Sequence, residues 1–194
     1  MLQEAPSPRI DLRNFTLLQT GVDVRAMREE LAHNEADWLI STVRQNTLRC
    51  QRETESIFLR TALRTDAQTA LEDVQTTQPA LAAPHFPRTL AWLHAAAGSL
   101  RGELGRALFA KIRPQGQVYR HIDAGRYYAC RRRFHLVIWS MEGSPMVCGS
   151  EEVLMREGEF WEFDNKKPHE AYNRATTPRV HLIFDVRVGG PAHG

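Results

Sequence analysis

Long apolar runs, frequent cysteines and a surplus of one charge are all missing from this sequence. No stretch approaches the roughly 18 consecutive apolar residues that a membrane span needs, so we expect no membrane-embedded part. Only 3 of the 194 residues are cysteine and none forms a C-x-x-C pair, which argues against a disulfide scaffold and favours a reducing compartment. The 25 lysines and arginines nearly balance the 23 aspartates and glutamates, which excludes a dedicated nucleic-acid binder.

Repeats and a secretory signal are absent too. The 12 glycines and 10 prolines follow no period, which excludes a collagen-like chain. The first residues, Met1–Pro8, contain neither a basic nor an apolar region of the kind found in signal peptides. We therefore expect a cytoplasmic protein without nucleic-acid or membrane partners, folded as one domain over residues 1–194. The sequence leaves the oligomeric state open.

The first half of the chain, residues 1–104, mixes helical and strand-like patterns. The patterns predict a strand at Phe15–Gln19, a helix from Asp23 to about Trp38, strands at Asn46–Arg52 and Glu55–Leu63, a polar surface connection over Thr65–Pro84, and a helix from Arg88 to Leu104. Gly105 then reads as the stop of the second helix.

Short strand-like segments separated by turn residues dominate residues 105–188. The predicted strands are Arg106–Ile112, Gln117–Ile122, Arg132–Ser140, Pro145–Gly149, Val153–Met155, Glu159–Phe163, Glu170–Asn173 and Arg179–Val188. Roughly eight short strands in about 80 residues are typical of a sandwich or barrel of the jelly-roll type. We expect a mainly β fold in which two helices from the first half pack outside this core.

Three residues of the second half form a candidate metal site. His121 and Asp123 lie two apart at the end of a predicted strand, so their side chains can face one point. His169 follows after several strands, far enough along for the chain to double back and bring it opposite them. Two histidines and one carboxylate on one face suit Fe(II) and leave positions open for other ligands. The alternative is that the H-x-D tripeptide at His121 occurs by chance and that His169 is a loop or partly buried histidine, with no metal bound.

Arg179 is a candidate anion-binding residue. It begins the last predicted strand, ten residues after His169. A guanidinium matches a carboxylate with two parallel hydrogen bonds, so an inward-facing arginine in an apolar barrel indicates an anionic partner. That partner is a ligand or the carboxylate of Asp185, and a merely structural arginine at a strand start is the third alternative.

Arg133 and His135 form a second candidate donor pair. They are two apart on one predicted strand and so share a face, where together they can bind a second carboxylate. The neighbouring Arg131 and Arg132 are expected to lie in solvent.

The ordered set of motifs resembles the aspartyl/asparaginyl β-hydroxylase family, which includes free-proline hydroxylases. The motifs lie between Gln117 and Val186: H-I-D from His121, R-F-H from Arg133, G-E-F-W-E-F-D-N from Gly158, H-E-A-Y-N from His169 and R-V-H-L-I-F-D-V from Arg179. The resemblance implies a double-stranded β-helix, a jelly-roll or cupin-like core formed by residues 105–188 and supported by residues 1–104. The first half carries no family motif.

The resemblance also implies an Fe(II)- and 2-oxoglutarate-dependent dioxygenase. His121, Asp123 and His169 would be its catalytic iron ligands, and Arg179, Arg133 and His135 would contact the 2-oxoglutarate co-substrate. Such an enzyme hydroxylates an amino acid, free or within a peptide, of the Asp, Asn or Pro type. It consumes O2, converts 2-oxoglutarate to succinate and CO2, and uses ascorbate as reductant. Because Asp123 is present, the chain resembles the branch of the family with a complete triad.

The substrate and the alternatives depend on weaker signals. Residues expected at the mouth of the barrel are candidates for substrate recognition: Arg126, Tyr127, Tyr128, Trp139 and the loop Asp164–Lys167. The alternative functions are a cupin-like protein that holds a metal or small acid without turnover, and a non-oxidative cupin enzyme using Zn(II) or Mn(II). Neither needs an arginine at the position of Arg179.

Overall fold

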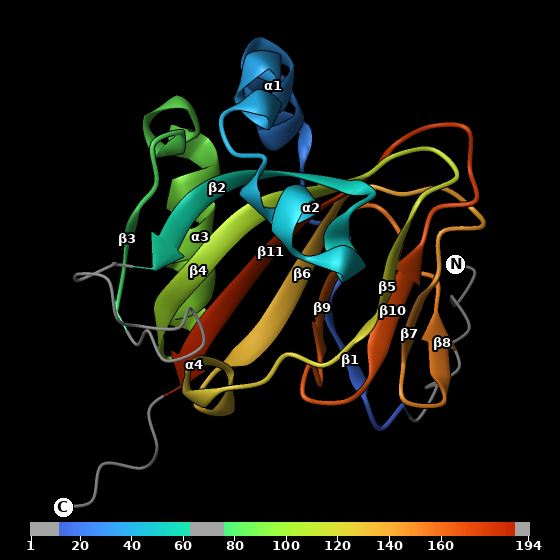
Figure 1. Ribbon diagram of the computed structural model, residues 1–194. Helices are drawn as coiled ribbons and strands as arrows, with labels where there is room; N and C mark the ends of the chain where they lie inside the picture. The colour runs from blue at the N-terminus through green and yellow to red at the C-terminus, as the bar shows by residue number, and fades with distance from the viewer. Residues whose placement is uncertain (1–11, 63–75, 189–194) are drawn as a thin grey trace, which may run out of the picture.

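Two antiparallel sheets face each other in the computed structural model, which describes residues 12–62 and 76–188 (Figure 1). In spatial order the larger sheet contains β1 (Phe15–Gln19), β9 (Phe160–Phe163), β6 (Arg132–Trp139), β11 (Arg179–Val188), β4 (Gly102–Ile112), β2 (Thr54–Ala62) and β3 (Thr77–Pro79). The smaller contains β5 (Gln117–His121), β10 (His169–Tyr172), β7 (Met146–Cys148) and β8 (Glu151–Val153). This arrangement is the predicted jelly-roll core, and β1 and β2 from the first half are built into it.

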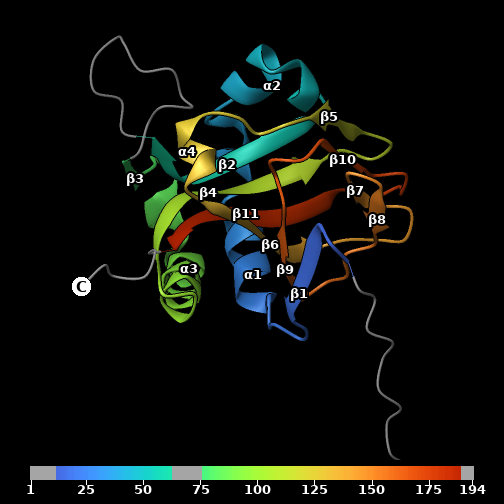
Figure 2. The ribbon, with the colours of Figure 1, turned by 90° about the horizontal axis from the view of Figure 1, so that it is seen from below.

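Helices cover the outer face of the larger sheet. α1 (Arg25–His33) and α3 (Pro87–Ser99) lie on one side of this sheet, whereas α2 (Val43–Thr47) lies on the other, beside β2 and β5 (Figure 2). A short helix, α4 (Arg126–Ala129), follows β5, and three-residue or five-residue 3-10 turns occupy Glu35–Leu39, Arg49–Gln51 and Ala83–His85. Among the described residues, no helix is long and apolar enough to cross a membrane.

The central strands are buried on both faces, and their side chains feed two separate cores. On β6, Phe134 and Leu136 point toward the helices and join one core with Leu93 of α3. The residues that alternate with them, Arg133, His135 and Val137, point toward the smaller sheet, where Val137 packs in the second core. Because strand side chains alternate between faces, polar residues placed at every second position are collected between the two sheets.

Seven of the eight predicted strands of the second half are confirmed with shifts at their ends, as are Phe15–Gln19 and the described part of Glu55–Leu63. The eighth, Val153–Met155, overlaps β8 only at Val153. The predicted strand Asn46–Arg52 is wrong, because this segment forms the end of α2 and the turn Arg49–Gln51. Its hydrogen bonds are local rather than between strands: the backbone N–H of Leu48 donates to the carbonyl of Arg44 (2.9 Å), and the hydroxyl of Thr47 donates to the carbonyl of Val43 (2.6 Å). The part of the connection Thr65–Pro84 before residue 76 lies outside the described residues; beyond it, the connection contains β3.

The second helix ends earlier than predicted. α3 stops at Ser99, Arg101 adopts a left-handed φ of 52°, and β4 then begins at Gly102. Gly105 is therefore a strand residue rather than a helix stop. A Cβ at this position would lie 2.6 Å from the hydroxyl of Tyr127, so the glycine is required by close packing of α4 on β4.

Candidate functional site

Three predicted ligands meet at the edge of the smaller sheet. His121 ends β5 and lies opposite His169 of β10 in the antiparallel register, which sets their ring centroids 4.2 Å apart. Asp123 lies just beyond β5, with Oδ1 4.0 Å from His121 Nε2 and Oδ2 3.9 Å from His169 Nε2. One ligand atom from each residue lies within 4.8 Å of the others, so the three together can hold a metal ion.

Backbone carbonyls fix both imidazoles in the form that a metal requires. Nδ1 of His121 donates to the carbonyl of Tyr119 (2.7 Å), and Nδ1 of His169 donates to the carbonyl of Lys167 (2.9 Å). With the hydrogen on Nδ1, the lone pair of each Nε2 faces Asp123. Burial lowers the pKa of both histidines, and that of His169, with His121 close by, falls to about 4. Both imidazoles are thus neutral near pH 7, as a metal ligand must be.

Asp123 is held by two neighbouring side chains. Oδ2 accepts a hydrogen bond from Nδ2 of the buried Asn165 (3.0 Å) and another from Nη1 of Arg133. Burial alone would raise the pKa of this carboxyl, but the charge of Arg133, the nearby His169 and the hydrogen bond from Asn165 together hold it below its usual range. The carboxylate is therefore ionised and fixed in orientation.

Arg133 is itself anchored on the neighbouring strand. Its Nε and Nη2 donate to the two carboxylate oxygens of Asp185 on β11 at 2.8 and 3.0 Å, and both side chains are buried. Asp185, which the sequence left open as a partner of Arg179, is thus the partner of Arg133. Three of the five N–H donors of Arg133 are engaged by protein carboxylates, so its predicted contact with a co-substrate would depend on the remaining two.

Arg179 has no ion-pair partner among the described residues. It is 4% exposed, lines the same cavity as His121 and His169, and its Nε and Nη2 have no hydrogen-bond acceptor there. Burial without a counter-charge lowers the pKa of this guanidinium to about 10, so it is still charged at neutral pH. An unpaired buried charge is costly for the protein alone, which makes the position suited to an anionic ligand.

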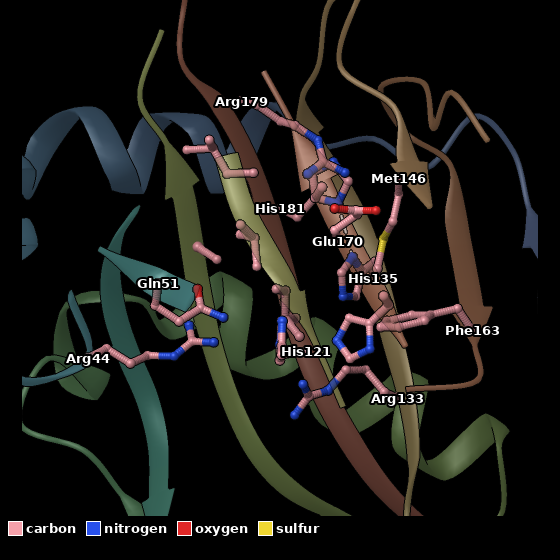
Figure 3. A pocket seen from close by; sticks show the side chains of 16 residues that line it. Arg44, Gln51, His121, Arg133, His135, Met146, Phe163, Glu170, Arg179 and His181 are labelled. Atoms are coloured by element: carbon pink, nitrogen blue, oxygen red, sulfur yellow. Dashed lines mark hydrogen bonds between the residues drawn. The ribbon is translucent and has the colours of Figure 1, made fainter. Parts of the chain in front are cut away.

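Two buried imidazoles lie beside Arg179 (Figure 3). Nδ1 of His135 and Nδ1 of His181 are 3.2 Å apart, and Nε2 of His181 has no partner among the described residues. Burial, followed by the charge of Arg179, holds the pKa of each well below its usual range, so both are neutral. Only one hydrogen lies between the two Nδ1 atoms. In the neutral pair, therefore, one imidazole presents an N–H at Nε2 and the other presents a lone pair.

The residues expected at the barrel mouth have other contacts. Tyr127 is fully buried, with its hydroxyl accepting from the backbone N–H of Arg106 (2.6 Å), and Trp139 is stacked by Arg28 with 5.0 Å between the guanidinium and the ring. Neither these residues nor Arg126, Tyr128 or Lys166 lines the cavity. Arg131, expected in solvent, is buried and donates to the carbonyl of Tyr127, whereas Arg132 is exposed as expected.

His181, Arg44 and Gln51 are among the cavity-lining residues that sequence reasoning did not single out. The alternation of strand residues was a usable signal for His181, since it lies two residues after Arg179, as His135 does after Arg133. Arg44 and Gln51 lie in and after α2, where a strand was expected in part, and no period marks them.

Lowering the pH is expected to destabilise the metal-free protein. The ordinary pKa of histidine is near 6.5, whereas that of folded His169 is about 4. Between these values the unfolded chain takes up a proton that the folded chain does not, so the stability present above pH 6.5 is lost as the pH falls toward 4. His169 alone would account for roughly 3 kcal/mol. Thermal unfolding from pH 7 to 4.5 measures this loss. The loss of stability should be smaller in His169→Gln than in wild type, and unchanged in His94→Gln, a change on the exposed side of α3. If stability falls equally with pH in wild type and both variants, His169 is not the group responsible.

Comparisons with known proteins agree with this geometry. Residues 22–188 match a family model described as Aspartyl/Asparaginyl beta-hydroxylase, and a search of curated proteins gives no match. A Pseudomonas putida prolyl-4-hydroxylase is similar in structure at 18% identity, with a TM-score of 0.54 and coverage of 91% of this chain and 94% of that one.

Two further solved structures share the fold. An oxidoreductase of the 2OG-Fe(II) oxygenase family from Burkholderia pseudomallei has 11% identity and a TM-score of 0.56, covering 71% of this chain and 67% of its own. The viral collagen prolyl hydroxylase of Paramecium Bursaria Chlorella virus-1 has 9% identity and a TM-score of 0.52, and the match covers 94% of this chain and 100% of the viral one. At such identities the similarity concerns the fold, and it confirms the expected double-stranded β-helix.

Proposed function

The chain belongs to the aspartyl/asparaginyl β-hydroxylase family, and on that premise we propose that it is an Fe(II)- and 2-oxoglutarate-dependent dioxygenase. Its substrate in this proposal is an amino acid, free or within a peptide. The observation that carries the proposal is the presence of two features in one cavity: a His-Asp-His group, and a buried Arg179 that has no ion-pair partner in the described part of the chain. A metal site alone fits many cupin-like proteins, whereas the added cation fits a co-substrate with a second acid group.

The donor set fits Fe(II). His121 and His169 offer neutral Nε2 atoms, and Asp123 offers an ionised carboxylate that reduces the charge of a dication. This combination is typical of non-haem Fe(II) sites. In the proposal these three residues bind the metal, and Arg133 and Asn165 keep the carboxylate in position, as outer partners of metal ligands commonly do.

The other end of the cavity fits the far carboxylate of the co-substrate, 2-oxoglutarate. Arg179 would bind it with its free Nε and Nη2, and the Nε2–H of either His181 or His135 would add a further donor. When bound, iron and 2-oxoglutarate supply the oxidising power, with O2 consumed and succinate and CO2 released. The chain itself binds and orients the acid, and the apolar side chains of Ile112, Val118 and Met146 limit the access of water.

A visible absorption band tests the proposal directly. Anaerobic addition of Fe(II) and 2-oxoglutarate should produce a weak metal-to-ligand charge-transfer band that neither component gives alone. A cupin-like protein that only binds a metal, or a Zn(II) or Mn(II) enzyme, would give none. Absence of the band at saturating Fe(II) and 2-oxoglutarate would contradict the proposal.

Asn165→Ala is expected to weaken metal binding without unfolding the protein. The change removes the hydrogen bond to Oδ2 of Asp123 but leaves all three metal ligands in place. Loss of such an outer partner typically costs about 10–100-fold in metal affinity. Titration with Fe(II) or Mn(II) measures the dissociation constant. Lys167→Ala in the same loop is the control, because its side chain is exposed and only its carbonyl contacts His169. Equal affinities in both variants would contradict the role of Asn165.

A further inference from the structure

The cavity contains a second arginine that forms no ion pair with a carboxylate in the described part of the chain. Arg44 projects from α2 and lines the cavity together with Gln51, on the side opposite Arg179 and Met146 (Figure 3). Among the described residues Arg44 forms no ion pair, and its one hydrogen bond runs from Nη1 to the hydroxyl of the buried Ser56 (3.2 Å). That bond fixes one edge of the guanidinium and leaves its other donors free.

Gln51 adds neutral donors next to this guanidinium. The side chain is 5% exposed, and its Oε1 lies 3.3 Å from the hydroxyl of Thr54, which donates to it. The amide hydrogens of Gln51 have no acceptor among the described residues. An arginine fork and an amide that both face one cavity form a binding site for a planar anion such as a carboxylate.

The charges around the cavity leave room for a second anion. Arg133 is matched by Asp123 and Asp185, and the carboxylate of Glu170 is matched by Arg120 at 3.0 Å. Arg44 and Arg179 are the two cavity-lining guanidinium groups without an ion pair among the described residues. Burial, followed by the charge of the neighbouring Arg133, lowers the pKa of Arg44, and the weaker opposing effect of the Asp123 charge does not offset them.

One co-substrate does not account for both cations. In the proposed function 2-oxoglutarate places its keto-acid end at the metal ligands and its far carboxylate at Arg179. Arg44 lies on the opposite wall and is left for a different molecule, which must reach the metal ligands from that side.

We propose that Arg44, assisted by Gln51, binds a carboxylate of the substrate that is hydroxylated. This inference rests on the proposed function and narrows its substrate to acids: a free amino acid held by its α-carboxylate, or a peptide held by an acidic side chain. Arg44 is accordingly a determinant of substrate specificity, and binding of the co-substrate does not depend on it.

A panel of paired probes tests the substrate class with the wild-type enzyme. L-proline, L-aspartate and L-asparagine are compared with their α-amides, and an amidated peptide containing Asp is compared with the same peptide containing Asn. The readout is succinate formed above the slow conversion of the co-substrate that occurs without substrate. We expect at least one acid to stimulate succinate formation and its amide partner to do so at least about tenfold less. The free amino acids and the peptides distinguish the two sources of carboxylate. If no acid stimulates turnover, or if acid and amide are equal, the proposal is wrong.

Variants of Arg44 test the residue itself. Arg44→Gln should raise the Michaelis constant for the stimulating acid at least about tenfold, and the Michaelis constant for 2-oxoglutarate in substrate-free turnover should stay within about twofold of wild type. Arg44→Lys keeps the charge but loses the forked donor geometry, so its Michaelis constant for the acid should lie between those of wild type and Arg44→Gln. Because it retains a cation, it also serves as the test variant if Arg44→Gln folds poorly. Arg49→Gln, a change of an exposed arginine in the next turn, is the control.

The outcomes separate the inference from the proposed function. A wild-type enzyme that forms no succinate from 2-oxoglutarate with Fe(II) refutes the proposed function. If the wild-type enzyme does form succinate, the proposed function stands and the variant decides the role of Arg44. That role is refuted if Arg44→Gln leaves the Michaelis constant for the substrate unchanged, or if it raises the Michaelis constant for the co-substrate instead.

Discussion

His169→Ala and Asp123→Ala are each expected to lower the rate of succinate formation from 2-oxoglutarate by more than about 100-fold. Loss of an outer partner alone costs about 10–100-fold in affinity or activity, and these changes remove the proposed ligands themselves. His169→Ala removes an Nε2 that lies 3.9 Å from the carboxylate of Asp123. Asp123→Ala removes the carboxylate that would reduce the charge of a bound metal, and it leaves Arg133 with Asp185 alone. The rate is measured with Fe(II) and ascorbate, with 2-oxoglutarate at saturation.

Folding must be checked in the same proteins. Thermal unfolding without metal distinguishes loss of the site from loss of the fold, and His94→Ala on the exposed face of α3 is the matched histidine control. Folded variants that form succinate at the wild-type rate would mean that His121, Asp123 and His169 do not hold the catalytic metal.

Arg133→Leu and Arg179→Leu are expected to differ in their effect on stability, although both residues lie on the inner face of the larger sheet. Arg133→Leu leaves the carboxylates of Asp123 and Asp185 facing each other without their cation, and removal of one partner of a buried pair costs roughly 3–5 kcal/mol of stability. Arg179→Leu removes a buried charge that has no ion-pair partner among the described residues, so its stability should stay within about 1 kcal/mol of wild type.

Arg179→Leu is expected to weaken binding of the co-substrate. Loss of a charge-assisted hydrogen bond of about 1.5–3 kcal/mol should raise the Michaelis constant for 2-oxoglutarate in Arg179→Leu by roughly 10–100-fold. Urea unfolding and initial rates measure the two effects. An unchanged Michaelis constant would place the co-substrate contact elsewhere, and a large loss of stability in Arg179→Leu would mean that this arginine has a structural partner.

The sequence predicted the parts of the site that depend on strand periodicity. His121 and Asp123 were found because residues two apart share a face, and the register of β10 with β5 brings His169 to them. Arg179 was singled out by its place at the start of the last strand, ten residues after His169. The short turns between strands, marked by glycine, proline, asparagine and aspartate, also allowed the strand positions of the second half to be predicted.

The remaining features depend on contacts between distant segments, which one sequence does not display. Asp185 is the partner of Arg133 because β6 and β11 pair in a register that sets these residues opposite each other. Arg44 reaches the cavity only because residues 43–47 form a helix beside the buried Ser56. Gly105 looked like a helix stop, yet the hydroxyl of Tyr127 is what excludes a side chain there.

The most direct measurement is succinate formation coupled to mass change in the substrate. The enzyme is incubated with Fe(II), ascorbate, O2 and 2-oxoglutarate and with the acids of the substrate panel. Succinate and the substrate are then quantified together. The proposed function predicts that one acid gains a single oxygen atom in proportion to the succinate released, and that both products vanish without Fe(II). Fe(II)-loaded protein that releases no succinate from 2-oxoglutarate, with or without any acid, would contradict it.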